Sequence, residues 1–211
     1  MVTTAERPGA PPITDNREAE LACVRRARAG DQRAFCTLVQ RYQTPVFNLC
    51  YRLLGRYDEA EDAAQETFLR AFARLNTYDE SHKFSSWLLS IGSHHCIDLL
   101  RRRRFTWLDI DDLSATLPSQ SRDDQPEQVT LRNEAEETIQ RLLGALPPDY
   151  RTIVVLYYWH QLSYEEIGDV LKISEPAVKS RLHRARRALA DKLSSQPAAQ
   201  QSLQRASAVG T

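Results

Sequence analysis

The sequence predicts an all-α protein of two small helical domains, joined by an extended acidic linker, with a helix-turn-helix in the second domain. Three observations lead to this fold. Apolar residues recur at spacings of three and four in two long stretches, the stretch between them is acidic and has no such period, and only seven of 211 residues are glycine. We expect domains at 17–104 and 131–195, a linker at 105–130, and disordered ends at 1–16 and 196–211.

The first domain is expected to begin with a long amphipathic helix. Asp31 is a suitable N-cap, and Gly55 is a suitable C-terminal stop. Pro45 inside the helix should kink or split it, because its ring removes one hydrogen bond and crowds the preceding turn. The apolar stripe of this helix consists of Phe35, Leu38, Val39, Tyr42, Val46, Leu49 and Leu53.

Two further helices are expected before the linker. Asp58 and Glu61 have the spacing of a capping box for the second helix. Its apolar stripe would be Ala64, Phe68, Ala71, Phe72 and Leu75. A polar, turn-like segment over 76–84 follows, and the third helix ends in the basic run 101–104. Trp87 in that third helix could stack on a base, but its spacing with Leu88 and Ile91 favours a place in the core.

The second domain resumes the helical period after a linker that contains Pro118 and Pro126. Its first helix has a stripe of Ile139, Leu142, Leu143 and Leu146, and it stops at Pro147 and Pro148. A short apolar helix is expected at about 150–159. The segment that follows it carries the most specific local pattern in the chain.

That pattern, between Ser163 and Leu193, predicts a helix-turn-helix. Ser163 and Glu166 form a capping box, Gly168 permits close approach of a neighbouring helix, and Ser174 can cap the second helix. Pro176 is tolerated in the first turn of that helix. One face of the second helix is apolar, with Val178, Leu182, Ala185 and Leu189, and the rest is basic, with Lys179, Arg181, Arg184, Arg186 and Arg187. A basic second helix of this kind is typical of major-groove reading.

Charge is sorted along the chain although the net charge is zero. Residues 172–192 hold seven basic against two acidic residues, and 105–128 hold six acidic against one basic. Residues 101–104 are all arginine, and 58–66 hold five acids and no base. Sorting of this kind is compatible with a nucleic-acid binder, whereas the acids at 58–66, taken by themselves, favour a solvated helix face.

Several other classes of protein are not indicated. No apolar run is long enough for a membrane span, and the first 16 residues lack the apolar core of a signal peptide. The four cysteines form no Cys-x-x-Cys pair. His94, His95, Cys96 and Asp98 offer too few ligands on one helix for a closed zinc site. Neither a nucleophile–base constellation nor a phosphate-binding glycine loop is present, so we expect no metal, no cofactor and no enzyme.

Both domains also carry longer motifs. The first domain has Glu61-Asp62-Ala63-Ala64-Gln65-Glu66-Thr67-Phe68, Phe84-x-x-Trp87-Leu88-x-x-Ile91 and Asp98-x-Leu100-Arg101-Arg102. The second has Leu146-Pro147-Pro148, Leu162-Ser163-Tyr164-Glu165-Glu166-Ile167 and 178–186, which reads VKSRLHRAR. Together these motifs span about 20–193. In their order and spacing they resemble the extracytoplasmic function (ECF) group of bacterial sigma factors, the subunits that give RNA polymerase its promoter recognition.

The resemblance implies three binding surfaces. The polymerase would contact Asp62, Gln65, Glu66, Phe68 and Leu69. The −10 promoter element would be read and melted by Asn76, Thr77, Tyr78, Asp79, Lys83, Phe84, His94, Arg101 and Arg102. The −35 element would be bound by Ser174, Glu175, Ala177, Lys179, Ser180, Arg181, His183 and Arg184.

Five positions depart from the usual family pattern. The family usually has Ala where Gly92 stands, Asn where His94 stands, Gly where Lys172 stands and Gly-Thr in place of Pro176-Ala177. These departures bear on promoter preference and leave the resemblance intact.

The implied partners are core RNA polymerase, through its beta and beta-prime subunits, promoter DNA, and an anti-sigma factor that could hold the chain near the membrane without membrane insertion. The implied location is cytoplasmic. A different function stays open, namely a free-standing helix-turn-helix regulator that binds operator DNA as a dimer. A helical enzyme is a more distant alternative.

Overall fold

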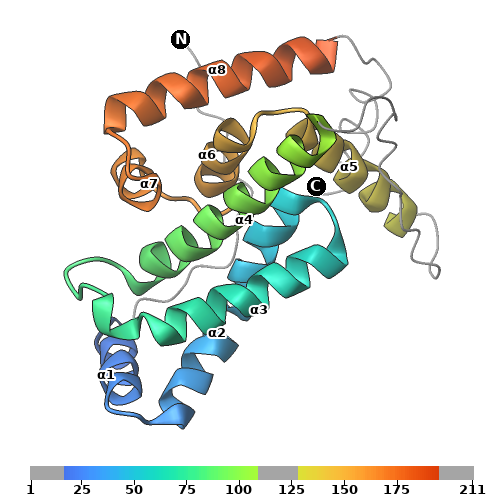
Figure 1. Cartoon of the computed structure of the whole chain (residues 1–211). Helices are drawn as coiled ribbons and strands as arrows, with labels where there is room; N and C mark the ends of the chain where they lie inside the picture. Colours follow the sequence, from blue (N-terminus) through green and yellow to red (C-terminus); the bar gives the residue numbers. More distant parts are fainter. Residues whose placement is uncertain (1–16, 109–127, 195–211) are drawn as a thin grey trace.

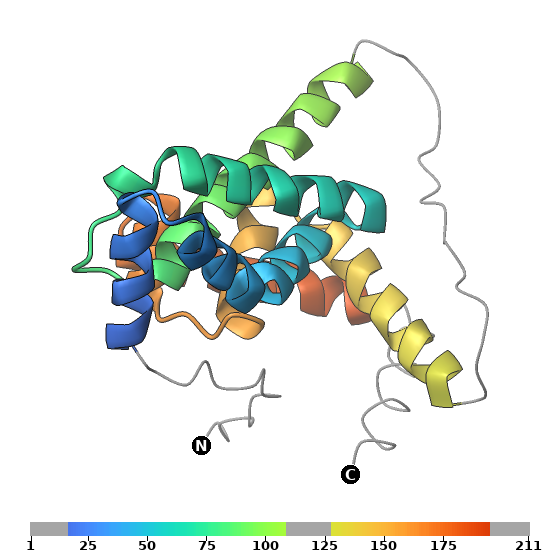
Figure 2. The ribbon, with the colours of Figure 1, turned by 90° about the horizontal axis from the view of Figure 1, so that it is seen from below.

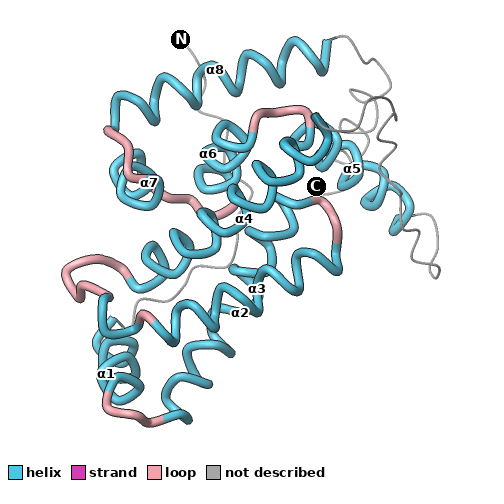
Figure 3. The backbone as a smooth tube through the Cα atoms, viewed as in Figure 1, coloured by secondary structure: helices cyan, strands magenta, loops and turns pink. Residues whose placement is uncertain are grey.

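The computed structural model describes residues 17–108 and 128–194, and every regular element in these two ranges is a helix (Figure 3). This confirms the all-α prediction. The expected arm (1–16), most of the expected linker (109–127) and the expected tail (195–211) lie outside the described residues.

The first domain consists of α1 (Arg17–Arg28), α2 (Gln32–Leu54), α3 (Tyr57–Ala73), the 3-10 turn η1 (Leu75–Thr77) and α4 (Phe84–Leu108). Helix α2 has both predicted ends: the Asp31 side chain accepts from the Ala34 N–H, and Gly55 has a left-handed conformation with φ 83°. The helix continues through Pro45, so the predicted split does not occur.

Two predictions for α3 are wrong. The helix begins at Tyr57, its N-cap is Arg56 without a side-chain hydrogen bond, and Asp58 pairs with Arg56 at 2.8 Å instead of starting a capping box. Phe72, which we placed on the apolar stripe, is 50% exposed. The buried face of α3 is narrower than predicted because small residues form it: Ala60, Ala63, Ala64, Thr67 and Ala71.

The core of the first domain lies where α2, α3 and α4 meet. Val46, Leu49 and Leu53 of α2 are fully buried against this contact. Gly92 of α4 permits the close approach, because a Cβ there would lie 3.2 Å from Leu49 and 3.3 Å from Thr67. An alanine at this position would therefore require its neighbours to shift.

The second domain consists of α5 (Gln128–Gly144), α6 (Pro148–Tyr158), α7 (Tyr164–Leu171) and α8 (Glu175–Ser194). The predicted linker was too long at both ends, because 105–108 continue α4 and 128–130 begin α5. These two helix ends project from the body of the molecule (Figure 2). Helical backbone conformation there does not depend on an apolar period, which is why the periodic pattern missed it.

Helices α7 and α8 form the helix-turn-helix. Both hydrogen bonds of the predicted capping box are present at Ser163 and Glu166. Lys172 ends α7 in the left-handed conformation, with φ 56°. A Cβ on Gly168 would lie 2.7 Å from the Ile173 carbonyl oxygen, so this glycine accommodates the turn and not, as we expected, a neighbouring helix.

The two domains pack on each other. Helices α5 and α6 contact α2, while α6 and α7 contact α4, so that α6 and α7 lie between α4 and α8 (Figure 1). The buried Arg151 of α6 joins the domains, because its guanidinium donates to the Leu53 carbonyl of α2 and to the Gly144 carbonyl of α5. Burial lowers the pKa of Arg151 to about 10, so its charge is retained at neutral pH.

Candidate nucleic-acid interface

Helix α8, the second helix of the helix-turn-helix, presents a polar face. The predicted residues Ser174, Glu175, Lys179, Ser180, His183 and Arg184 are exposed, whereas Ala177 and Arg181 are half-buried. Lys179 pairs with Glu175 at 2.7 Å, and its ammonium lies 5.5 Å from the centre of the Tyr164 ring. The apolar face, with Val178, Leu182 and Ala185, is buried as predicted.

The loop between α3 and α4 divides the predicted −10 residues into two groups. Asn76, Thr77, Asp79 and Lys83 are exposed. Tyr78 and Phe84 are 4% and 1% exposed, and their rings lie 5.3 Å apart in an edge-to-face contact. Trp87 packs against both rings and against the core, which confirms the interpretation of Trp87 as a core residue.

The predicted residues on α4 lie close to the second domain. His94, Arg101 and Arg102 are exposed. A cleft of about 280 Å³ is lined by His94 and Arg101 of α4, Asp149 of α6 and Arg181 of α8. Arg101 pairs with Asp149 at 3.1 Å. Residues predicted for the −10 element and for the −35 element therefore line one cleft.

An ion pair and a second polar contact join the loop to α7. Lys83 lies 3.0 Å from Glu166, and His82 lies 3.7 Å from Asp169. Burial alone would raise the pKa of Glu166, but the Ser163 backbone N–H and the Lys83 ammonium outweigh it and hold the pKa below its usual value. Glu166, on the acidic side of α7, thus neutralises Lys83 at the end of the loop.

The predicted polymerase-contacting residues occupy the outer side of α3. Asp62 and Gln65 are exposed, and Leu69 is 66% exposed. Glu66 is paired with Arg70 at 2.6 Å, and this hydrogen bond lowers the pKa of Glu66. Phe68 is instead half-buried against the core. Phe72 lies one turn beyond Leu69. Its ring is exposed, although it was predicted on the buried stripe.

An apolar groove of about 630 Å³ was also missed. It lies between α5, α6 and α8, and its lining includes Leu142, Leu143, Tyr158, Trp159, Leu189 and Leu193. The helical stripes contained several of these residues, but a stripe does not show which of its side chains remain uncovered after packing.

Within 17–108 and 128–194, no group of three or more His, Cys, Asp or Glu side chains is arranged for a metal ion, and the four cysteines are free thiols. No helix in these ranges has the length and apolar character to cross a bilayer.

Comparison with known proteins identifies the family. The model of sigma-70 region 2 matches residues 38–106, and that of sigma-70 region 4 matches residues 136–189. The chain therefore belongs to the sigma-70 family, whose members are transcription initiation subunits and not enzymes. Within it, the chain belongs to the ECF group: it is 39% identical to the ECF RNA polymerase sigma factor SigW of Bacillus subtilis over 176 residues, which cover 81% of this chain and 94% of SigW.

Two solved structures have a similar fold. The chain is similar to CnrH, solved in complex with the cytosolic domain of CnrY, with a TM-score of 0.62 and 27% identity over 84% of this chain and 98% of CnrH. It also shares the fold of the sigma factor RpoE of Bartonella quintana, solved with the anti-sigma factor NepR, with a TM-score of 0.61 and 20% identity over 76% of this chain and 96% of RpoE.

Proposed function

We propose that the chain is an alternative sigma factor of the ECF type, which binds core RNA polymerase and directs promoter recognition, DNA melting and transcription initiation. The observation that carries the proposal is the presence of sigma-70 regions 2 and 4, in that order, each with an exposed polar surface. The chain performs no covalent chemistry in this role, because the polymerase supplies it.

Each surface has a separate role in this proposal. The outer side of α3, with Asp62, Gln65 and Leu69, docks on the beta-prime subunit, and region 4 contacts the beta subunit. The exposed residues of the loop between α3 and α4 capture an unstacked base of the −10 element, which lowers the cost of melting. Arg101 and Arg102 hold backbone phosphates. The N-terminal half of α8, around Lys179 and Ser180, reads the −35 element in the major groove.

The packing of the two domains supports a polymerase-dependent function. The two promoter elements lie roughly 25 base pairs apart, which is about 85 Å at 3.4 Å per base pair. In the structure His94, Arg101 and Arg181 line a single cleft. Both elements therefore cannot be engaged in this arrangement, and the domains must separate on a promoter. Polymerase, which contacts both domains, supplies the free energy for that separation.

An anti-sigma factor is part of the proposal. It would bind the helical surfaces of both domains in the cytoplasm and keep the chain from polymerase until a signal arrives. The structural relative RpoE was solved with such a partner, NepR. Pull-downs from unstressed cells of the native host should return this partner. If they return polymerase subunits alone, this part of the proposal is wrong.

Run-off transcription with core polymerase on a panel of promoter templates tests the proposal, together with gel shifts by the chain alone. A sigma factor gives specific transcripts with core and only weak duplex binding without it. The variant Arg184→Gln on α8 should reduce transcription, and Arg26→Gln on α1 serves as its matched control. A tight operator shift by the chain alone, without promoter-specific transcripts, would instead establish a dimeric repressor or activator.

A further inference from the structure

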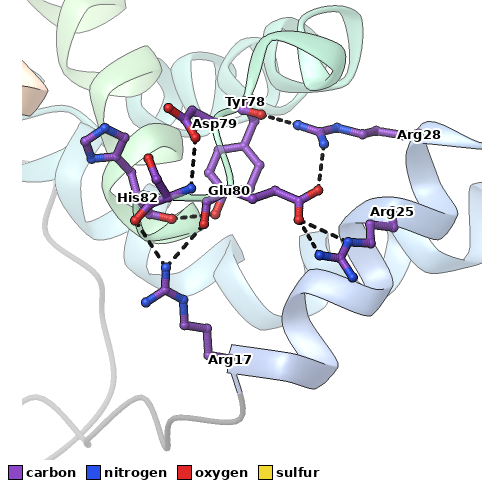
Figure 4. A network of polar contacts seen from close by, with 8 residues as sticks. Arg17, Arg25, Arg28, Tyr78, Asp79, Glu80 and His82 are labelled. Atoms are coloured by element: carbon purple, nitrogen blue, oxygen red, sulfur yellow. Dashed lines mark hydrogen bonds and ion pairs between the residues drawn. The ribbon is translucent and has the colours of Figure 1, made fainter.

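Helix α1 holds the backbone of the loop between α3 and α4. The Arg17 guanidinium donates to the carbonyl oxygens of Glu80 and Ser81, each at 3.2 Å. The Arg28 guanidinium donates to the carbonyl oxygen of Leu75 at 3.0 Å and to that of Tyr78. Four carbonyls of one loop thus point toward arginines of one helix, as Figure 4 shows for those of Tyr78 and Glu80.

Glu80 connects this helix to the loop a second time. One carboxylate oxygen accepts from Arg28 at 2.8 Å, and the other accepts from Arg25 at 2.7 Å and 3.0 Å (Figure 4). The hydrogen bond from Arg25 lowers the pKa of Glu80, so the carboxylate stays ionised at neutral pH. Planar guanidinium groups suit such forked contacts, which a lysine in the same place could not reproduce.

Hydrogen bonds within the loop also hold its conformation. The Tyr78 hydroxyl donates to the His82 carbonyl at 2.7 Å, and the Asp79 carboxylate accepts from the Ser81 N–H at 2.9 Å. The Arg28 guanidinium lies 5.6 Å from the centre of the buried Tyr78 ring. Backbone acceptors on the α1 side are thereby occupied, while the side chains of Asn76, Thr77 and Lys83 are exposed.

We propose that α1 is the positioning element of the −10 loop: Arg17, Arg25 and Arg28 hold the backbone of 75–82 in the conformation that accepts a promoter base, and they thereby set the discrimination among −10 sequences. This inference rests on the proposed sigma function. It goes beyond the family match, because the region 2 match begins at residue 38 and α1 ends at Arg28. A loop held before binding loses less conformational entropy on binding, and this saving appears as affinity for the correct base.

The direction in which one substitution changes DNA binding distinguishes a positioning role from a purely electrostatic one. If the α1 arginines only attracted DNA, Glu80→Gln would strengthen DNA binding, because it removes a negative charge from the surface. If they position the loop, Glu80→Gln releases Arg25 and Arg28 and weakens discrimination at the −10 element. Arg25→Gln is the second variant, since Arg25 is 66% exposed and its replacement leaves the core intact. Arg26→Gln is the matched control, because Arg26 pairs with Asp31 and not with the loop.

The experiment uses the full chain with core polymerase on a template library that has a fixed −35 element and a randomised −10 element. Wild-type and Arg26→Gln holoenzymes should give the same ratio of transcripts between preferred and disfavoured bases. Glu80→Gln and Arg25→Gln should reduce that ratio by at least about fivefold at one −10 position, with core affinity and −35 preference unchanged. Hydrogen exchange of the 75–83 amides should become faster in both variants, while exchange in α3 and α4 stays unchanged.

Two results would overturn the inference, and a third concerns the function itself. Wild-type discrimination in both variants, or a gain of transcription on every template in Glu80→Gln, removes the positioning role and leaves the sigma function standing. If the wild-type holoenzyme shows no −10 preference on the library, the proposed function of the loop fails, whatever the variants do.

Discussion

The outer side of α3 differs from the surfaces of α4 and α8 in whether another part of the chain packs against it. On α3, Asp62, Gln65 and Leu69 are uncovered, so the proposed polymerase surface is available in the structure. The proposed DNA surfaces instead meet across one cleft, where Arg101 is neutralised by Asp149. The difference implies an order of events, in which the chain docks on polymerase first and separates its two DNA surfaces from each other afterwards.

Reversal of two charges on α3 should have the largest effect. The double variant Asp62→Lys, Glu66→Lys places like charges against a basic polymerase surface, so affinity for core should fall at least about 30-fold. Helical content and melting temperature should stay close to the wild-type values, since both side chains lie outside the core. The measurement is co-purification and a binding titration with core polymerase.

The control for this variant reverses two exposed acids elsewhere, in Glu18→Lys and Asp191→Lys. It should bind core as wild type does. Equal binding by the two double variants would show that α3 is not the polymerase surface. The proposed difference between α3 and the DNA surfaces would then be wrong.

Acid should destabilise the second domain through His160. The Nε2 atom of this ring is buried without a hydrogen-bond partner among the described residues, and burial lowers the pKa of His160 to about 4. Because the folded-state pKa lies below the unfolded value, stability is full above about pH 6.5 and is lost as pH falls toward 4. The loss between pH 7 and pH 5 should be about 2 kcal/mol.

The check is urea unfolding of wild type and His160→Leu at both pH values. The leucine variant should lack this part of the acid sensitivity, while sensitivity from other titrating groups remains in both proteins. Parallel losses in the two proteins would show that His160 is already protonated in the folded chain at pH 5.

Two substitutions on α8 should separate base reading from phosphate binding. Lys179 lies near the N-terminus of the helix, so Lys179→Ala should reduce transcription unequally among −35 variants, roughly tenfold at one base pair. Arg187 lies further along, so Arg187→Ala should weaken all templates alike and lower the slope of the salt dependence by about one. Transcription from a saturating set of −35 sequences at two salt concentrations gives both quantities. A uniform loss for Lys179→Ala would place the reading surface elsewhere on α8.

A smaller effect is expected when the contacts between the domains are weakened. Asp149→Asn with Asp169→Asn removes the partners of Arg101 and His82, so the free chain should bind −35 duplex DNA about three- to tenfold more tightly. Glu165→Gln with Asp191→Asn makes the same change of charge away from these contacts. If this control gains as much affinity, net charge alone explains the result, and the contacts do not restrain the DNA surfaces.

The sequence predicted the helix-turn-helix well because its determinants are local. Ser163 and Glu166 lie three residues apart and satisfy each other's backbone, and α8 alternates a buried and a basic face. The all-α class followed from the same helical period. Asp58 failed as a cap because Arg56, two residues away, offered its carboxylate an ion pair.

The features that sequence reasoning missed depend on contacts between distant segments. Tyr78 and Phe84 were predicted on the −10 surface, but both are buried in the structure. The contact between Tyr78 and Arg28 of α1, which the sequence did not predict, shows that Tyr78 helps to join the loop to α1. Arg151 resembles any surface arginine in the sequence, yet it is buried between the carbonyls of Leu53 and Gly144. Spacing along a helix carries no information on either contact.

The order of events can be tested by closing the domains reversibly. In the structure, His82 Nδ1 lies 3.7 Å from Asp169 Oδ2, across the contact between the domains. Cysteines introduced there by His82→Cys and Asp169→Cys can be joined by a short bis-methanethiosulfonate. The same chain carries Cys23→Ser and Cys36→Ser, so that these two thiols do not react. The joined chain should still bind core polymerase through α3 but give no promoter-specific transcript, and a reducing agent should restore transcription. Transcription by the joined chain at the level of the reduced chain would contradict the account, because promoter binding would then not require the domains to separate.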